Sequence, residues 1–257
     1  MSTFSLRTLC LTTITVLTLA ACATSPTGRH QLRLVSDTEM TQMGITAFDE
    51  LKQKEKLSTD ARTNAYVQCV ANAITREIGG TWEVQVFDSK EVNAFALPGG
   101  KIGVYTGLLK VATTQDQLAA VLGHEVGHVQ AGHSAARVSN QMVAQLGVGI
   151  LAGSTGISPE MIGMGANLLL VLPNSRGDES ESDIIGQKLM AQAGFDPAQA
   201  VQLWNNMAKA SSGAPPQMLS THPSSDTRIR DLSKNLPNVT PIYQQARAAG
   251  KKPGCTP

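Results

Sequence analysis

The strongest constraint on the fold of this chain is a pair of histidines four residues apart, with a glutamate directly after the first: His124-Glu125-Val126-Gly127-His128. Thr114 and Gln117, upstream of this motif, match a helix N-terminal capping box. Apolar side chains then follow at helical spacing, at Leu118, Val121, Leu122 and Val129. Because residues four apart lie on one face of an α-helix, both imidazoles can reach a single metal ion.

This spacing is typical of zinc-dependent peptide hydrolysis. Zinc binds imidazole nitrogen well, and catalytic zinc sites keep one position open for water. The ion lowers the pKa of that water to about 7. A carboxylate such as Glu125 can then take the proton and return it to the leaving amine. We therefore expect one zinc ion per chain, with His124 and His128 as ligands and Glu125 as general base.

His133 is the first candidate for a third protein ligand. It lies nine residues after His124, and at about 100° per residue this places it on the opposite side of a continuous helix. A third histidine in the metzincin pattern would lie one residue later, at Ser134, and the glycine of that pattern is replaced by Ala131. We therefore expect His133 to be a structural or surface residue.

A carboxylate from another helix is the better candidate, and residues 175–183 offer four carboxylates. Glu179 and Asp183 are four residues apart and share a helical face. One could bind the metal while the other accepts the free ring N–H of a ligand histidine. Spacing alone leaves the choice between Glu179 and Glu181 open.

The N-terminus is typical of an export signal, with Arg7 before an apolar run from residue 9 to 21. This run is too short for a stable membrane span. Leu-Ala-Ala-Cys at 19–22 resembles the bacterial lipobox, which implies cleavage before Cys22 and lipid attachment to it. Ala23 after the cysteine favours sorting to the outer membrane. We expect a signal peptide at 1–21, a lipidated tether at 22–34 and one domain at 35–257.

The bulk composition fits that single domain. A hydrophobic content of 42% and a formal net charge of +1 suit a packed globular chain. Basic residues form no cluster beyond Lys251 and Lys252, so nothing indicates nucleic-acid binding. After Cys10 in the signal and Cys22, the cysteines left are Cys69 and Cys255. In an oxidising compartment they can form a disulfide, and two unpaired thiols are the alternative.

Periodicity and capping residues predict a mostly helical chain with a short sheet in its middle. The apolar, glycine-containing segment 142–172 has polar interruptions, which favour two short packed helices or a flap over a transmembrane hairpin. The chain end from 237 contains proline and glycine and is predicted to be irregular. Expected helices are 36–56, 60–78, 114 onward, 179–193, 197–210 and 225–235, and expected strands are 82–87, 92–97 and 101–105.

Four stretches together carry a resemblance to a known family: Asn93 to Gly100, Leu122 to His128, Ser175 to Asp183, and Thr221-His222-Pro223 with Arg228. They resemble the HtpX-like and CAAX-prenyl-protease-like zinc metalloendopeptidases, most closely the soluble periplasmic lipoprotein branch. The resemblance implies that Glu179 is the third ligand and that Asp183 supports the site. The family usually has Ala where this chain has Ser182, a change that we expect to leave the site intact.

The resemblance also implies that a strand containing Asn93, Ala94, Phe95 and Ala96 borders the cleft. A substrate could add to this edge as a further strand through main-chain hydrogen bonds, which suits unfolded proteins. His222 could stabilise the oxyanion, act as a movable gate at the open zinc position, or be structural. Arg228 could pair with a carboxylate near the site or form a structural ion pair elsewhere.

The resulting prediction is a zincin-type α+β domain, mostly helical, with a small antiparallel sheet bordering the active-site cleft. Its predicted function is that of a zinc metalloendopeptidase of the gluzincin type. The expected substrates are misfolded or stress-damaged cell-envelope proteins, and the expected location is the periplasmic face of the outer membrane, held by the lipid anchor. The alternative is a zinc-stabilised envelope chaperone or assembly factor with little proteolytic turnover.

Overall fold

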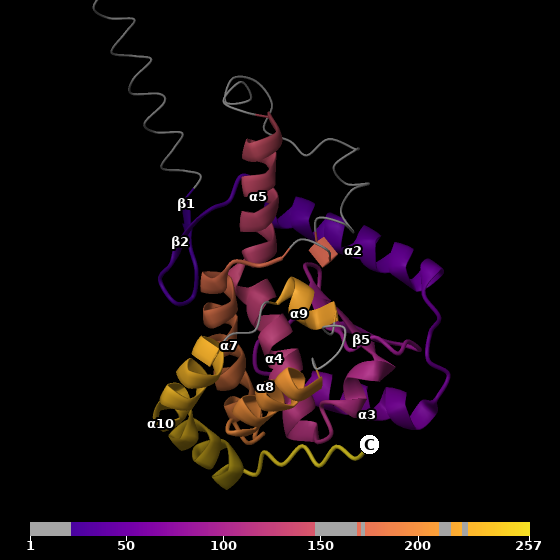
Figure 1. Ribbon diagram of the computed structural model, residues 1–257, viewed down its shortest axis with the longest axis vertical. Helices are drawn as coiled ribbons and strands as arrows, with labels where there is room; N and C mark the ends of the chain where they lie inside the picture. Colours follow the sequence, from indigo (N-terminus) through magenta and orange to yellow (C-terminus); the bar gives the residue numbers. More distant parts are fainter. Residues whose placement is uncertain (1–21, 147–168, 171–172, 211–216, 223–225) are drawn as a thin grey trace, which may run out of the picture.

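The chain folds into a mostly helical structure with two small sheets in the part that the structure describes (Figure 1). The predicted α+β class is therefore confirmed. None of the described helices has both the length and the hydropathy that a membrane span requires. The predicted signal peptide and most of the apolar segment 142–172 lie outside the described residues. The computed structural model describes residues 22–146, 169–170, 173–210, 217–222 and 226–257.

The helix α4 (Gln115–Ala131) carries the histidine pair and lies in the middle of the fold (Figure 1). It begins where Thr114 accepts a hydrogen bond from the backbone N–H of Gln117 at 3.2 Å. Most of its residues are buried, because apolar side chains surround it on nearly all sides. Gly132, in the left-handed conformation at φ 71°, ends it and redirects the chain into α5 (His133–Leu146).

The helix α7 (Arg176–Gln192) packs directly on α4. Ser175 and Asp178 form a capping box at its start, so the helix begins three residues before the predicted position at 179. Glycines bring the two backbones together: a Cβ on Gly186 would lie 2.6 Å from backbone atoms of Gly123 and His124. This close approach brings the carboxylates of α7 to the histidines of α4.

The main sheet consists of β3 (Glu83–Phe87), β4 (Ala94–Leu97) and β5 (Lys101–Tyr105), in the order β3-β5-β4. A tight turn at Gly99 and Gly100, both with positive φ, makes β4 and β5 antiparallel as predicted. However, β3 pairs with the other edge of β5 and runs parallel to it. The sheet is therefore mixed, and the prediction of a wholly antiparallel sheet is wrong for β3.

Two helices precede this sheet. The helix α2 (Asp37–Lys54) begins at Ser36, which forms the predicted capping box with Glu39. The helix α3 (Ala61–Thr75) begins at Asp60 and packs its apolar face against α4 and the sheet. A short 3-10 helix, η1 (Thr106–Lys110), leads from β5 toward α4. These elements enclose the core that holds α4 in place.

The predicted tether contains a β-hairpin. Its strands β1 (Cys22–Thr24) and β2 (His30–Leu32) are antiparallel, and the turn between them contains Gly28 at φ 90°. Gln31 Nε2 donates a hydrogen bond to the Ala131 carbonyl at the end of α4. The segment is thus attached to the domain, which a polar composition alone did not indicate.

The C-terminal part comprises α8 (Gln199–Ala210), α9 (Gln217–Thr221) and α10 (Asp226–Ala248). The prediction that α10 ends near 235 is wrong, because the helix continues through Pro237 and Pro241. Each proline removes one helical hydrogen bond, but Val239 and Ala246 beyond the first proline are buried in the fold. The tail then reaches α3, where a disulfide joins Cys69 to Cys255.

Candidate metal centre

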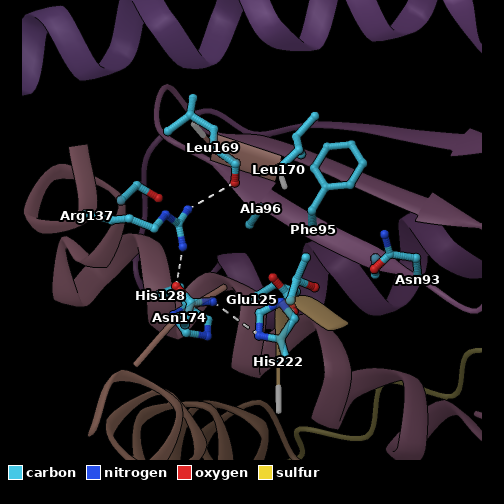
Figure 2. A pocket seen from close by; sticks show the side chains of 13 residues that line it. Asn93, Phe95, Ala96, Glu125, His128, Arg137, Leu169, Leu170, Asn174 and His222 are labelled. Carbon is cyan, nitrogen blue, oxygen red and sulfur yellow. Dashed lines mark hydrogen bonds and ion pairs between the residues drawn. The ribbon is translucent and has the colours of Figure 1, made fainter. Parts of the chain in front are cut away.

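The strand β4 and the helix α4 border one cavity, which has histidines and a carboxylate on its floor (Figure 2). Asn93, Ala94, Phe95 and Ala96, the predicted edge-strand residues, all line it. In the described residues β4 pairs only with β5, so its other edge is the one next to the site. The structure therefore brings the predicted edge strand and the histidine motif to one cavity.

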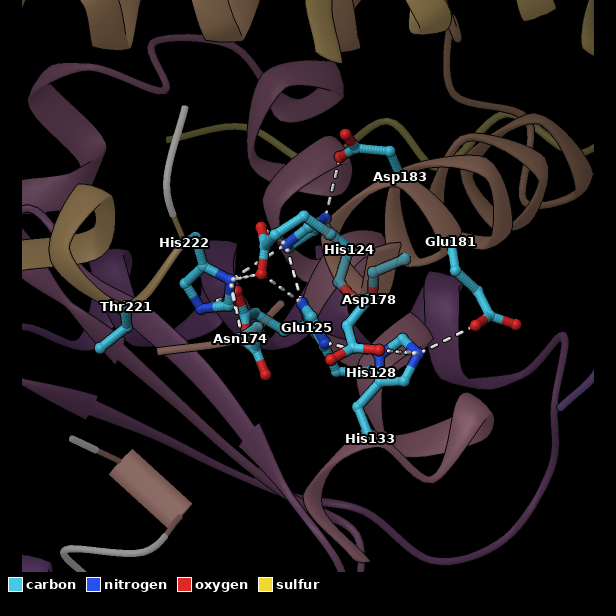
Figure 3. Close-up of polar contacts among 12 residues, drawn as sticks. His124, Glu125, His128, His133, Asn174, Asp178, Glu181, Asp183, Thr221 and His222 are labelled. Carbon is cyan, nitrogen blue, oxygen red and sulfur yellow. Dashed lines mark hydrogen bonds and ion pairs between the residues drawn. The ribbon is translucent and has the colours of Figure 1, made fainter. Parts of the chain in front are cut away.

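Four buried side chains converge beside this cavity: His124 and His128 from α4, Glu179 from α7, and His222 just after α9. Figure 3 shows the three histidines together. Their donor atoms all lie within 4.8 Å of one another. His124 Nε2 lies 3.0 Å from His128 Nε2 and 3.2 Å from His222 Nδ1. His222 Nδ1 lies 3.0 Å from Glu179 Oε1.

These separations match the size of a small coordination sphere. Donor atoms at about 2.0–2.1 Å from a tetrahedral ion lie about 3.3–3.4 Å from one another. Both ligand candidates on α4 also lie 3.4 Å from a Glu179 oxygen. Three imidazoles and a carboxylate are a donor set that zinc accepts, so the residues present fit this ion.

Glu125 lies next to these donors and lines the cavity (Figure 2). Its side chain is buried, and its Oε1 lies 3.4 Å from His222 Nε2. No hydrogen bond reaches that oxygen from the described residues. The carboxylate is therefore available to a small polar molecule in the cavity, which is the position that a general base needs.

Arg228, on α10, links two carboxylates of the centre. Its Nε and Nη2 donate to both oxygens of Asp183 at 2.7 Å, and its Nη1 lies 2.7 Å from Glu179 Oε2. Asp183 in turn contacts His124 Nδ1 at 2.9 Å. The guanidinium also stacks 3.7 Å from the ring centre of Trp204. This network fixes the orientation of the His124 ring through Nδ1, the nitrogen that does not face the other donors.

The electrostatics of the cluster favour a cation. Burial raises the pKa of a carboxylate, but hydrogen bonds from the three histidines outweigh it and hold the pKa of Glu179 far below its usual range. Burial and the charge of Arg228 lower the pKa of His124, yet Asp183 and Glu179 outweigh both and raise it to about 9. Burial lowers the pKa of His128. The carboxylates that favour a proton on His124 equally favour a metal cation there.

His133 lies outside the four donors and is a buried structural residue, but it does not face away from the motif as the rotation argument implied. Its ring is 1% exposed, and its Nδ1 lies 2.8 Å from His128 Nδ1 (Figure 3). The rotation argument assumed one continuous helix, but Gly132 ends α4 and turns the next residue back toward the motif. That glycine was the signal in the sequence. Glu181, the rival candidate to Glu179, lies beside His133 and outside the four donors.

Two further residues of the cavity were missed from the sequence, Arg137 and Asn174 (Figure 2). Arg137 Nη2 donates to the Leu169 carbonyl at 3.0 Å, and its Nη1 donates to Asn174 Oδ1. Asn174 Nδ2 lies 3.4 Å from His222 Nδ1. Neither residue belongs to a motif, and only the fold brings α5 and the segment before α7 to the same cavity.

Comparison with known proteins agrees with this geometry. The model of peptidase family M48 matches residues 58–236. The mitochondrial metalloendopeptidase OMA1 of Schizosaccharomyces pombe is 40% identical over 182 residues, which are 69% of this chain and 54% of that protein. Metalloprotease LoiP of Escherichia coli is 30% identical over 212 residues, 79% of this chain and 82% of that protein. The beta-barrel assembly-enhancing protease of Yersinia pestis is 27% identical over 223 residues, 80% of this chain and 45% of that protein.

The chain thus spans about half the length of the OMA1 proteins that it matches. The family match includes the histidine pair on α4 and the carboxylates of α7, and it covers more than half of the chain. The resemblance inferred from the sequence motifs is confirmed, and the chain belongs to peptidase family M48, a family of zinc metalloproteases.

Proposed function

We propose that this chain is a zinc-dependent endopeptidase, with His124, His128 and Glu179 as its protein ligands. The observation that carries the proposal is the convergence of these three donors next to a cavity that His128 and Glu125 line. The ion, when bound, would polarise the scissile carbonyl and lower the pKa of water. Water can then lose a proton near neutral pH and attack that carbonyl. Glu125 takes a proton from the attacking water and returns it to the leaving amine.

Two residues around the ligands support the site in this proposal. Asp183 accepts the Nδ1–H of His124, so that Nε2 of the same ring presents its lone pair to the ion. Arg228 holds Asp183 with two hydrogen bonds and lies against Glu179. Its positive charge also offsets the repulsion between these two buried carboxylates.

His222 acts as a gate in this proposal. Its Nδ1 lies 3.2 Å from His124 Nε2 and 3.0 Å from Glu179 Oε1, whereas His124 Nε2 lies 3.4 Å from Glu179 Oε2. The conformation described here therefore supplies a fourth protein donor, which a catalytic zinc site leaves to water or substrate. Cleavage then requires the His222 side chain to move away from the ion.

The substrate class follows from the strand edge. An extended polypeptide can pair with β4 through main-chain hydrogen bonds, and such pairing depends little on side chains. Unfolded segments meet this requirement most readily, because most main-chain groups of a folded protein are already paired. We propose misfolded or damaged envelope proteins as substrates, with the chain lipid-anchored through Cys22 at the periplasmic face of the outer membrane. Both LoiP and the beta-barrel assembly-enhancing protease are bacterial relatives, and the name of the second supports a place in the bacterial envelope.

Casein cleavage by the purified chain from residue 22 tests the proposal. We expect cleavage that stops with a zinc chelator and returns when zinc is added back. Cleavage that continues in chelator would contradict the metal-dependent mechanism. A chain that holds zinc and suppresses aggregation of an unfolded protein, but does not cut it, would instead identify a chaperone.

A further inference from the structure

A line of contacts leads from the metal centre to the N-terminal hairpin. His128 points its Nε2 at the other donors and its Nδ1 at His133 Nδ1, 2.8 Å away. His133 Nε2 then lies 3.1 Å from Glu181 Oε2 (Figure 3). The side chains of His133 and Glu181 are each 1% exposed. The contacts therefore run through the interior of the protein.

The hairpin holds Glu181 from its other side. Ser25 and Thr27, in the turn between β1 and β2, both donate hydroxyl hydrogen bonds to Glu181 Oε1. Arg29 Nη1 donates to Glu181 Oε2 at 2.7 Å and also reaches Asp178 at 3.0 Å. Ser25 is itself buried. These donors lie more than 150 residues from Glu181 in the chain, so only the docked hairpin brings them there.

Hydrogen-bond chemistry determines which atom donates and which accepts in each of these contacts. An ionised carboxylate can only accept, so His133 must carry a hydrogen on Nε2. Neutral His133 then has a lone pair on Nδ1, which accepts the Nδ1–H of His128. The same neutral His128 therefore has a lone pair on Nε2, the atom that faces the donor cluster. This tautomer is the one that can bind a metal ion.

Each of the two motif histidines is thus oriented by a carboxylate that lies on the side of its ring away from the donor cluster. The ring of His124 is oriented by the carboxylate of Asp183 directly, whereas the ring of His128 reaches the carboxylate of Glu181 through His133. Carboxylates behind metal-binding imidazoles fix ring orientation and tautomer, and their removal typically lowers metal affinity by about 10- to 100-fold.

We propose that His133 and Glu181 are positioning residues for the zinc ligand His128, and that the 22–32 hairpin belongs to the metal centre through Ser25, Thr27 and Arg29. This inference rests on the proposed assignment of His128 as a ligand. Cys22, the proposed lipidation site, is the first residue of the same hairpin. The segment that would lead to the membrane therefore also completes the support of the metal ligand.

The test is zinc affinity, measured by competition with a chromophoric chelator. His133→Phe keeps a ring of similar size but removes both hydrogen bonds, and we expect its dissociation constant for zinc to rise by about 10- to 100-fold. In His133→Asn the side-chain oxygen can still accept from His128 Nδ1, so its affinity should lie between wild type and His133→Phe. This order tests hydrogen bonding to His128 specifically, because a packing role would favour the aromatic replacement.

The hairpin is tested by the double variant Ser25→Ala with Thr27→Val, which leaves the α4 and α7 residues unchanged. We expect a smaller rise in the dissociation constant and a lower melting temperature of the metal-free protein, because the buried Glu181 carboxylate loses two donors. Zinc affinity is therefore measured well below that temperature. His30→Ala is the matched control, since His30 is exposed on β2 and does not contact Glu181.

Unchanged zinc affinity in the hairpin variant would overturn the hairpin's part, and unchanged affinity in His133→Phe would overturn the positioning role. If His133→Phe does not fold, His133→Asn decides the latter. These outcomes are separate from the proposed function. A wild-type chain that binds zinc without cleaving casein would contradict that function and leave the affinity comparison valid.

Discussion

At the scale of single residues, His222 is the side chain that touches both the candidate ligands and the proposed general base. Its two ring nitrogens face different partners, with Nδ1 at the donors of His124 and Glu179 and Nε2 3.4 Å from Glu125. One ring thus touches both the ligands and the general base. In the proposed mechanism the fourth metal position is therefore occupied while His222 keeps this position, although Glu125 still lines the cavity.

His222→Ala should therefore raise the rate of casein cleavage. If the covered form makes up about nine-tenths of the molecules, the rise is about tenfold. Zinc affinity should fall, because one donor is lost, so the rate is measured at saturating zinc. A fall in activity with zinc still bound would show that His222 stabilises the oxyanion instead.

The residues whose position the sequence predicted, and the one whose position it did not, differ for a physical reason. His124 and His128 share a face because local helical geometry holds between them. The same geometry failed for His133, since Gly132 ends the helix before it. Glu179 and Glu181 were equivalent by spacing, and only the packing of α7 on α4 separates their neighbours.

At the scale of elements, the contact between α4 and α7 determines the geometry of the centre. Gly123 and Gly186 leave the two backbones with no room for a side chain. Ser182 Oγ donates to the His124 carbonyl at 2.8 Å, so even the serine that departs from the family pattern ties the two helices together. Glu179 and Asp183 reach His124 only because the helices lie this close.

Gly186→Ala tests this contact through the sign of its effect. In an unobstructed helix the change would stabilise the protein by about 0.5–1 kcal/mol. Here the added methyl group would lie 2.6 Å from backbone atoms of α4, so we expect destabilisation by about 1–3 kcal/mol and weaker zinc binding. Urea unfolding measures the first, and Lys188→Ala, exposed on the same helix, is the control. A stabilised Gly186→Ala variant would contradict the packing argument.

A second prediction concerns the attachment of α2 to the sheet. Glu83 on β3 pairs with Lys101 on β5 and with Lys52 on α2, and hydrogen bonds from Lys101 and then Lys52 lower the pKa of Glu83. A lowered pKa contributes stability above the unfolded-state value, and this contribution is lost as pH falls through the folded-state value. Glu83→Gln should remove it, by less than about 1 kcal/mol because the pair is partly exposed. Urea midpoints at pH 7 and below pH 4 should differ less in the variant than in wild type.

The secondary structure was predictable wherever local signals agreed. Ser36 with Glu39 marked the start of α2, and residues 101–105 were placed correctly as a strand. The wrong predictions concern tertiary choices. The continuation of α10 through Pro237 depends on burial of Val239, and the parallel pairing of β3 depends on which edge of β5 is free.

At the scale of the whole molecule, the C-terminal tail joins distant parts of the fold. The disulfide between Cys69 and Cys255 spans 186 residues. The backbone N–H of Cys255 donates to Gln115 Oε1 at the start of α4, at 2.8 Å. The carbonyl of Pro257 accepts from Arg62 on α3. The tail thus connects α10 to α3 and to the first turn of the metal-binding helix.

Replacing both cysteines by serine should lower the free energy of unfolding by up to about 5 kcal/mol, the chain-entropy value for a loop of this length. Zinc affinity of the folded variant should change little, since the bond lies at the opposite end of α4 from the histidines. Calorimetry with and without a reductant measures the first effect. A wild-type protein whose melting temperature is unaffected by reduction would contradict it.

The central claim is that Glu125 acts as the base beside an intact metal site, and Glu125→Gln tests it most directly. We predict that this variant retains about one zinc per chain, measured by elemental analysis, while casein cleavage falls by about 10²- to 10⁴-fold. Glu91→Gln, an exposed change of the same kind, should keep both zinc and activity. A Glu125→Gln protein that holds zinc and cleaves casein at the wild-type rate would contradict the account.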